Sequence, residues 1–204
     1  MEVGKTCERE HDFTLVLNGV DHLDEDVADA LFGAGCDDAT PSLRFGKVYL
    51  TFTRTARSLR EAILTAIRDV RRARIGADVL RVDECDLVTQ AEIGRRVGRS
   101  RQVINQYISG KRGPGGFPPP TCEITDGTSL WLWSEVAYWL RQNDMIKEQD
   151  LVDARDRDAI NAILDYQRQM QLEPAAFEEL SESLRPLTDH LDPISLPHVG
   201  PPGG

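Results

Sequence analysis

The first 86 residues alternate between short extended runs and helical runs of apolar side chains. Strand patterns cover residues 13–19, 42–54 and 77–82, and the middle one contains a turn that makes it a hairpin. Apolar residues three and four positions apart predict helices over residues 23–35 and 58–73. The predicted order is therefore β-α-β-β-α-β, the ferredoxin-like arrangement of an α+β protein.

The pattern changes after residue 86 to that of short, closely spaced helices. Thr89 and Glu92 form a capping-box pattern at the start of a first helix, and Ser100 is a candidate N-cap for a second. Gly98 separates the two helices, and Gly110 suits the end of the second. We expect these two helices, joined by a tight turn, to form the first part of a second domain over residues 87–142.

A stretch rich in Gly and Pro follows, with a predicted hairpin at Asp126-Gly127 and a third short helix over residues 134–142, capped by Ser134. Four large aromatic side chains lie in or near this stretch: Phe117, Trp131, Trp133 and Trp139. They suit either the core of a small domain or a surface that stacks the bases of a single strand. Their position beside a capped helix favours the core.

Residues 143–186 are acidic and predicted to be mainly helical, with a second helix over residues 175–184. A loose apolar stripe consists of Met145, Val152, Ile160, Ile163, Leu164 and Met170. Residues 187–204 contain so much Pro and Gly that we expect a disordered tail.

Charge separates these three parts of the chain. The net charge of −10 is divided into −5 over residues 1–86, +3 over residues 87–142 and −8 over residues 143–204. A basic middle part in an acidic chain indicates a surface that faces a polyanion.

Other classes of function find little support. The four cysteines form no C-x-x-C pair and the four histidines have no metal-ligand spacing, so we expect no disulfide framework, no metal and no cofactor. No phosphate-binding glycine motif is complete, and we expect no enzyme. The sequence shows no signal peptide and no apolar run of membrane length, which predicts a cytoplasmic protein without membrane contact.

The second short helix of the middle domain has two distinct faces. At about 100° per residue from Arg101, the polar residues Asn105, Ser109, Gln102 and Gln106 fall within an arc of about 140°. Val103, Ile104, Tyr107 and Ile108 fill the opposite arc. The polar arc holds no carboxylate and offers the Arg, Asn and Gln side chains that match base edges in the major groove. An ordinary solvated face is the alternative, but it usually carries Glu and Lys pairs.

Residues around this helix add candidate phosphate contacts. Thr89 and Gln90 start the first helix, where free N–H groups can meet a phosphate. The cations Arg95, Arg96, Arg99, Lys111 and Arg112 could neutralise phosphates, although singly each also suits a solubilising face. The candidate DNA-binding residues are Thr89, Gln90, Arg95, Arg96, Arg99, Ser100, Arg101, Gln102, Asn105, Gln106, Ser109, Lys111 and Arg112.

A family pattern is carried by Leu87-Val88-Thr89, Ala91-Glu92-Ile93, Val97-Gly98-Arg99-Ser100-Arg101, Val103, Tyr107-Ile108, Gly110, Phe117-Pro118, Pro120, Leu130-Trp131, Ser134-Glu135-Val136 and Trp139-Leu140. With these residues the middle domain resembles the winged helix-turn-helix of the MerR/excisionase (AlpA-like) class. The resemblance implies a recognition helix over residues 100–109 and a wing over residues 113–132. Gly94 departs from the usual Ala of the first helix and permits close helix packing. Residues 13–140 also resemble an actinobacterial type of helix-turn-helix protein.

These features together predict a sequence-specific regulator that binds double-stranded DNA as a homodimer. Residues 1–86 would then serve dimerisation or the binding of a partner or effector. The alternative is an antitoxin or adaptor whose acidic helices after residue 142 bind a basic protein partner, such as a toxin, while DNA binding is autoregulatory.

Overall fold

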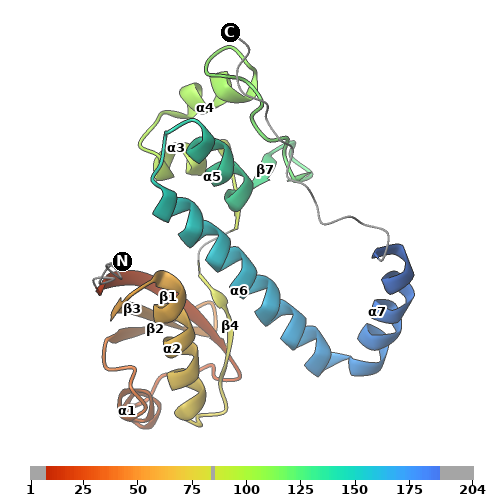
Figure 1. Ribbon diagram of the computed structural model, residues 1–204. Coiled ribbons are helices and arrows are strands. Elements are labelled where there is room, and N and C mark those ends of the chain that lie inside the picture. The colour runs from red at the N-terminus through yellow and green to blue at the C-terminus, as the bar shows by residue number, and fades with distance from the viewer. Residues whose placement is uncertain (1–7, 84–85, 189–204) are drawn as a thin grey trace, which may run out of the picture. The chain divides into compact units, whose positions relative to one another are not determined.

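The computed structural model describes residues 8–83 and 86–188 (Figure 1). Over these residues the protein is a mixed α+β structure with seven helices, a four-stranded antiparallel sheet and a three-stranded sheet. The chain divides into two compact units, residues 1–164 and residues 165–204. The α+β class predicted from the sequence is confirmed.

The predicted order of six elements is found at the start of the chain. They are β1 (Arg9–Asn18), α1 (Glu25–Gly33), β2 (Ala39–Arg44), β3 (Lys47–Ala56), α2 (Leu59–Arg72) and β4 (Asp78–Val82). The sheet has the order β2-β3-β1-β4, and all neighbouring strands are antiparallel. β1 begins earlier than residue 13, where the apolar pattern starts, because its polar first residues pair with the end of β3, with Arg9 opposite Ala56.

Alternate residues of β1 and β3 and one face of α2 form the core of this region. Leu15, Phe52 and Ile63 are fully buried or nearly so, and the ring of Phe13 stacks on that of Phe52 with centroids 5.1 Å apart. Each large apolar side chain that is removed from water in this way contributes roughly 1.5–3 kcal/mol to the stability of the folded state. Amphipathic strands and a strongly amphipathic helix therefore fold onto each other as their periodicity predicts.

A buried arginine, which the sequence did not single out, links three elements of this region. The guanidinium of Arg54 in β3 donates two hydrogen bonds to the carboxylate of Asp38, at 2.7 and 2.8 Å, and one to Asp69 of α2 at 2.8 Å. A further hydrogen bond reaches the carbonyl oxygen of Gly35 at 2.7 Å. The hydrogen bonds that Arg54 donates to Asp38 raise the pKa of its guanidinium above the ordinary value. Burial, followed by the charge of Asp69, raises the pKa of the neighbouring Cys36 thiol to about 11, so Cys36 stays protonated.

The long helix α6 (Glu148–Leu172) does not present its predicted stripe as one surface. Ile160 and Leu164 are buried in the core of the four-stranded sheet region, whereas Val152 and Ile163 are exposed. Leu151, which lies outside the stripe, is buried against residues of the preceding helix. The apolar residues of α6 therefore serve more than one contact within the chain.

Polar side chains of α6 also contact the sheet region. Asp156 is buried and forms an ion pair with the guanidinium of Arg60 in α2. The amide of Asn161 accepts a hydrogen bond from the N–H of Val82 at 2.8 Å and donates one to its carbonyl at 3.3 Å, so it occupies backbone groups of the edge strand β4. Acidic residues of α6 thus have partners in the same chain.

The last helix, α7, spans Pro174–Thr188. It confirms the predicted helix over residues 175–184. The helix begins one residue earlier and ends four residues later, so that it includes the first two residues of the expected tail. The remainder of the expected tail, residues 189–204, lies outside the described residues, as do Cys7 and Cys85. No helix in the described part of the chain has the length and apolar character needed to cross a membrane.

Candidate nucleic-acid interface

The basic middle part of the chain folds as two short helices, a hairpin and a third helix. The elements are β5 (Leu87–Val88), α3 (Gln90–Arg96), α4 (Arg101–Ile108), β6 (Cys122–Glu123), β7 (Ser129–Leu132) and α5 (Trp133–Gln142). The strands form a sheet of order β5-β7-β6 with antiparallel neighbours. The two predicted helices, the hairpin at Asp126-Gly127 and the third helix are all present.

Two of the three predicted N-caps are confirmed. The hydroxyl of Thr89 accepts the N–H of Glu92 at 3.2 Å, and that of Ser100 accepts the N–H of Val103 at 3.3 Å. The third prediction is wrong, because α5 begins one residue earlier and its Leu132 cap provides no side-chain hydrogen bond. The Ser134 hydroxyl instead donates to Asp158 of α6 at 2.9 Å.

The two arcs predicted for α4 are confirmed by its burial. Ile104 and Tyr107 are 0% and 6% exposed, and Val103 and Ile108 pack partly buried against the same core. Arg101, Gln102, Asn105 and Ser109 are exposed, and Gln106 is partly exposed. The side-chain amides of Gln102 and Asn105 have no hydrogen-bond partner among the described residues. The polar arc of α4 is therefore open to a ligand.

The turn between α3 and α4 depends on a close approach at Gly94. The N–H of Arg99 donates to the carbonyl of Gly94 at 2.8 Å, and a Cβ on Gly94 would lie 2.6 Å from the carbonyl oxygen of Arg99. A Cβ is excluded at this distance, so the Ala usual for the resembled class does not fit this turn. Gly94 thus allows the backbone at Arg99, just before α4, to contact the backbone of α3 closely.

We expect Gly94→Ala to destabilise the α3–α5 region by about 1–3 kcal/mol, because the backbone at Arg99 has to move. Helix propensity alone predicts the opposite, a gain of up to about 1 kcal/mol. All three tryptophans lie in this region, so denaturant unfolding followed by tryptophan fluorescence reports its stability. Ala91→Gly, at an exposed position of α3, calibrates the propensity effect. If the Gly94→Ala variant is more stable than the wild type, the carbonyl oxygen of Arg99 must lie farther from residue 94 than in this structure.

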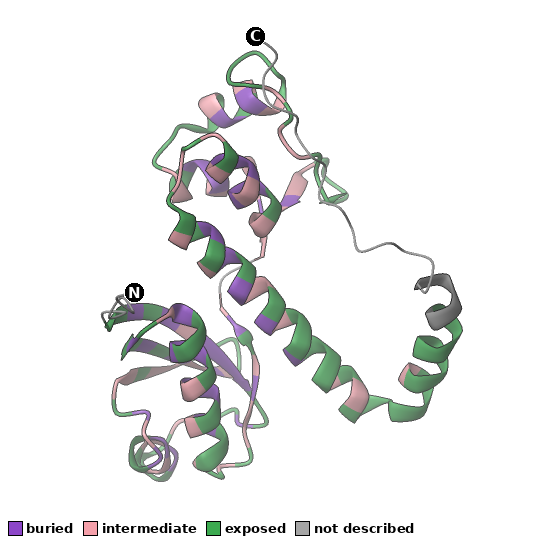
Figure 2. Ribbon diagram, in the orientation of Figure 1, coloured by how far each residue is buried: buried purple, intermediate pink, exposed green. Residues whose placement is uncertain are grey.

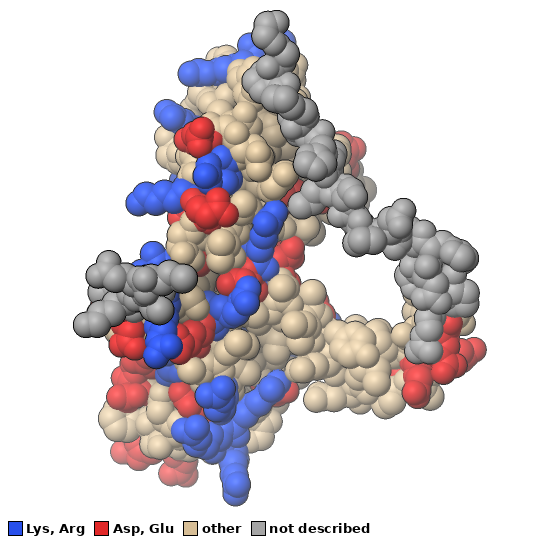
Figure 3. All heavy atoms as spheres, in the orientation of Figure 1, with Lys and Arg blue, Asp and Glu red and all other residues tan. Residues whose placement is uncertain are grey.

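Four cations near α4 are exposed and form no ion pair with any described residue: Arg99, Arg101, Lys111 and Arg112. Arg99 and Arg101 lie at the start of the helix, and Lys111 and Arg112 follow its end. Figure 3 shows blue side chains projecting at the top of the view, where α4 and the loop after it lie in Figure 1. The polar arc is thus bordered at both ends by positive charge.

The other two predicted cations are engaged within the domain. The guanidinium groups of Arg95 and Arg96 both bind the carboxylate of Glu92, with Nε–O distances of 2.9 Å. The side chain of Arg96 is only 14% exposed, and its guanidinium lies 4.8 Å from the ring centroid of Trp133. Arg96 therefore packs inside the domain, and its role as a phosphate contact stays a prediction. Nothing in the sequence linked it to Trp133.

The same ion pairs change the predicted capping box. Glu92 directs its carboxylate to Arg95 and Arg96, so only the Thr89 half of the box is present. Hydrogen bonds from Arg95, opposed by partial burial and assisted by Arg96, lower the pKa of Glu92 from its usual 4.5 to about 2. Because the folded pKa lies below the unfolded one, this carboxylate stabilises the fold above pH 4.5 and loses the effect as the pH falls through 2.

We expect Glu92→Gln to lower the stability of this region at pH 7 by about 0.5–1 kcal/mol, because it removes one ion pair to the exposed Arg95 and one to the partly buried Arg96. The difference from wild type should shrink as the pH falls from 4.5 towards 2, because the wild-type carboxylate then becomes protonated. Tryptophan-monitored unfolding at several pH values measures both effects. Glu135→Gln, which removes an exposed carboxylate of α5, is the matched control. A difference that stays constant over this pH range would contradict the assigned ion pairs.

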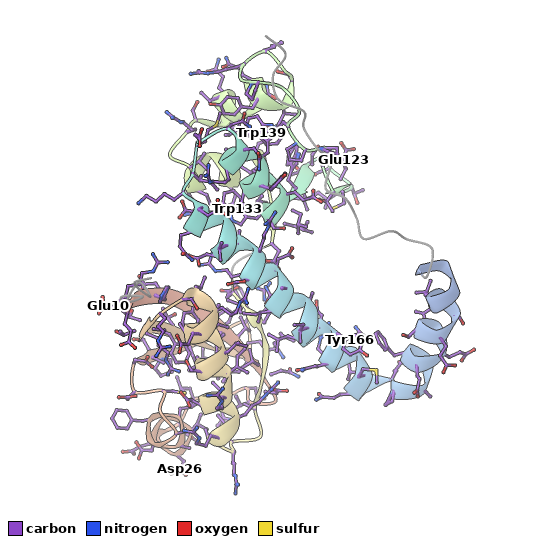
Figure 4. The ribbon with its side chains drawn as sticks, viewed as in Figure 1. Glu10, Asp26, Glu123, Trp133, Trp139 and Tyr166 are labelled. Atoms are coloured by element: carbon purple, nitrogen blue, oxygen red, sulfur yellow. The ribbon has the colours of Figure 1, made fainter. Side chains whose placement is uncertain are left out.

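The aromatic side chains pack inside the domain and hold the Gly/Pro loop. The indole N–H of Trp139 (Figure 4) donates to the carbonyl of Gly115 at 2.9 Å, and that of Trp131 donates to Pro118 at 3.1 Å. The ring of Phe117 stands edge-on to Trp139 with centroids 4.9 Å apart. The interpretation of these three residues as core rather than base-stacking surface is confirmed.

The hairpin that follows the loop differs from the loop in charge. Glu123 and Asp126 are exposed on it, and residues 113–132 contain no Lys or Arg (Figure 4). The basic part of the surface therefore ends at Arg112, before the predicted wing begins.

Most of the remaining predicted site residues form hydrogen bonds within the domain. The hydroxyls of Thr89 and Ser100 act as N-caps, and that of Ser109 donates to the carbonyl of Asn105 at 2.8 Å. Gln90 is partly exposed at the first position of α3. Among the uncharged predicted site residues, the side chains of Gln102 and Asn105 are exposed and form no hydrogen bond with a described residue.

Comparison of the chain with protein-family models, with curated proteins and with solved structures finds no match. Three or more His, Cys, Asp or Glu side chains placed to hold a metal ion are not found among the described residues. The features of this domain that bear on function are the geometry and charge of α3, α4 and the loop after them.

Proposed function

We propose that this protein is a double-stranded DNA-binding regulator of transcription that reads the major groove with α4. It acts in the cytoplasm by binding rather than by catalysis. The observation that carries the proposal is the polar arc of α4, which is exposed, free of carboxylates and bordered by Arg99, Arg101, Lys111 and Arg112 in a chain of net charge −10. Arg, Asn and Gln on one helix face are the side chains that pair with base edges.

The dimensions of α4 support this assignment. A helix with its side chains is about 10–12 Å across, and the major groove is about 12 Å wide, so α4 can lie in the groove. Arg99 before the helix, and Lys111 and Arg112 after it, would then be available to backbone phosphates beside the groove. In this proposal the loop at Lys111–Gly116, and not the acidic hairpin tip, lies on the DNA backbone.

The order of elements supports the finer fold assignments. A sheet of order β4-β1-β3-β2 with α1 and α2 as connections is the pattern of the ferredoxin-like fold. Helices α3 and α4 joined at Gly94 and Gly98, followed by the β6–β7 hairpin and α5, fit a winged helix-turn-helix. We do not propose a basic protein partner at α6, because Asp156 and Asp158 are engaged within the chain.

We expect the 204-residue chain to bind duplex DNA with an affinity that falls steeply with salt. Each neutralised phosphate contributes about −0.9 to the slope of log affinity against log salt concentration, so three or four contacts give a slope of roughly −3 to −4. Genomic fragments recovered at low salt supply the duplex, and fluorescence anisotropy at several salt concentrations measures the slope. Absence of binding to any fragment at low salt would disprove the proposal.

A further inference from the structure

The second unit of the chain presents an apolar seam along α7. Phe177, Leu180 and Leu184 follow one another at spacings of three and four residues, which places them on one side of the helix. Leu180 and Leu184 remain 58% and 48% exposed, and Figure 2 shows most of the described part of α7, residues 174–184, as exposed. Phe177 contacts the ring of Tyr166 (labelled in Figure 4) at 5.2 Å between centroids.

A helix with such a seam needs a partner to be stable in water. α7 has 15 residues, a length at which isolated helices are marginal, and most helical stability comes from packing of the apolar face. Within the unit, Tyr166 covers only the start of the seam at Phe177. The exposed leucines indicate that another surface covers the rest.

The charges of α7 indicate what that surface is. With Phe177 and Leu184 at heptad position a and Leu180 at d, the acids Glu178, Glu179 and Glu182 occupy the outward positions b, c and f. The positions that flank the seam hold Ala176, Ser181 and Ser183, which are uncharged. Charges at the positions that flank a helical seam select its partner. A helix that binds a basic partner would carry acidic residues at these positions, and α7 carries none there. A second copy of α7 can approach without repulsion, because the acidic residues of both copies point away from the seam.

We propose that α7 pairs with α7 of a second copy of this chain through Phe177, Leu180 and Leu184. This dimer does not require DNA binding. If α4 also reads DNA as proposed above, the dimer carries two recognition helices, and the preferred site is then an inverted repeat.

Light scattering of the 204-residue chain in the absence of DNA tests the seam. We expect a mass of twice 22.8 kDa for the wild type, and half that mass for the variant with Leu180→Asp and Leu184→Asp. The matched control, Glu179→Gln with Glu182→Gln, changes two outward positions and should stay dimeric. Unchanged tryptophan fluorescence checks that the seam variant keeps the α3–α5 region folded.

Two outcomes would overturn the proposal. A wild-type protein of 22.8 kDa at every concentration would mean that the seam serves another partner. A seam variant that remains dimeric would mean that a different surface joins the copies. Either result leaves the DNA-binding proposal standing, because duplex affinity is measured separately.

Discussion

Replacing Arg99, Arg101, Lys111 and Arg112 together with Ala should reduce the affinity for duplex DNA by up to about 10³–10⁴-fold at roughly 0.1 M salt. The reason is the loss of counterion release at up to four phosphates, since these side chains are exposed and form no ion pair with a described residue. The slope of log affinity against log salt should become less steep by up to about 3.6. Anisotropy titrations of wild type and variant over the same salt range provide both values.

A matched variant separates local contact from net charge. Arg44, Arg57, Arg68 and Arg74 are also exposed but belong to the four-stranded sheet region. Their replacement with Ala lowers the net charge of −10 by the same four units. We expect this control to weaken binding only slightly, through the long-range field. If both variants lose equal affinity, DNA is not held at α4.

Ile104→Asp should unfold the α3–α5 region, with a loss of more than about 4 kcal/mol, because it removes a large apolar side chain from the core and introduces a buried charge. Ile104 is 0% exposed and belongs to the core that also contains Ile93, Trp131 and Trp139. Tryptophan emission should shift to that of solvated indoles at low denaturant. DNA binding should be lost together with the fold.

Asn105→Ala, one position along the same helix, is the matched variant on the exposed arc. It should melt like wild type and lose about 1–3 kcal/mol of binding to its preferred site, while binding to unrelated duplex changes little. An Ile104→Asp variant that melts like wild type would mean that the helix is rotated from the described position. Equal loss on all sequences for Asn105→Ala would mean that this side chain does not read bases.

The local elements of this protein and the two faces of α4 could be predicted from the order of residues alone. Periodicity is a property of neighbouring residues, so the β-α-β-β-α-β order and the apolar arc at Ile104 and Tyr107 could be predicted. The Thr89 and Ser100 caps are equally local, since each joins a hydroxyl to an N–H three residues later.

Which polar and charged side chains form contacts inside the fold became clear from the three-dimensional structure. Arg96 and Arg99 are both basic residues beside the same turn, yet Arg96 is engaged by Glu92 and Trp133 whereas Arg99 stays exposed. The charge network at Arg54 and the burial of Asp156 in α6 likewise join residues far apart in sequence. Such contacts depend on which surfaces meet in space, and a pattern that repeats every two or four residues carries no information about distant partners.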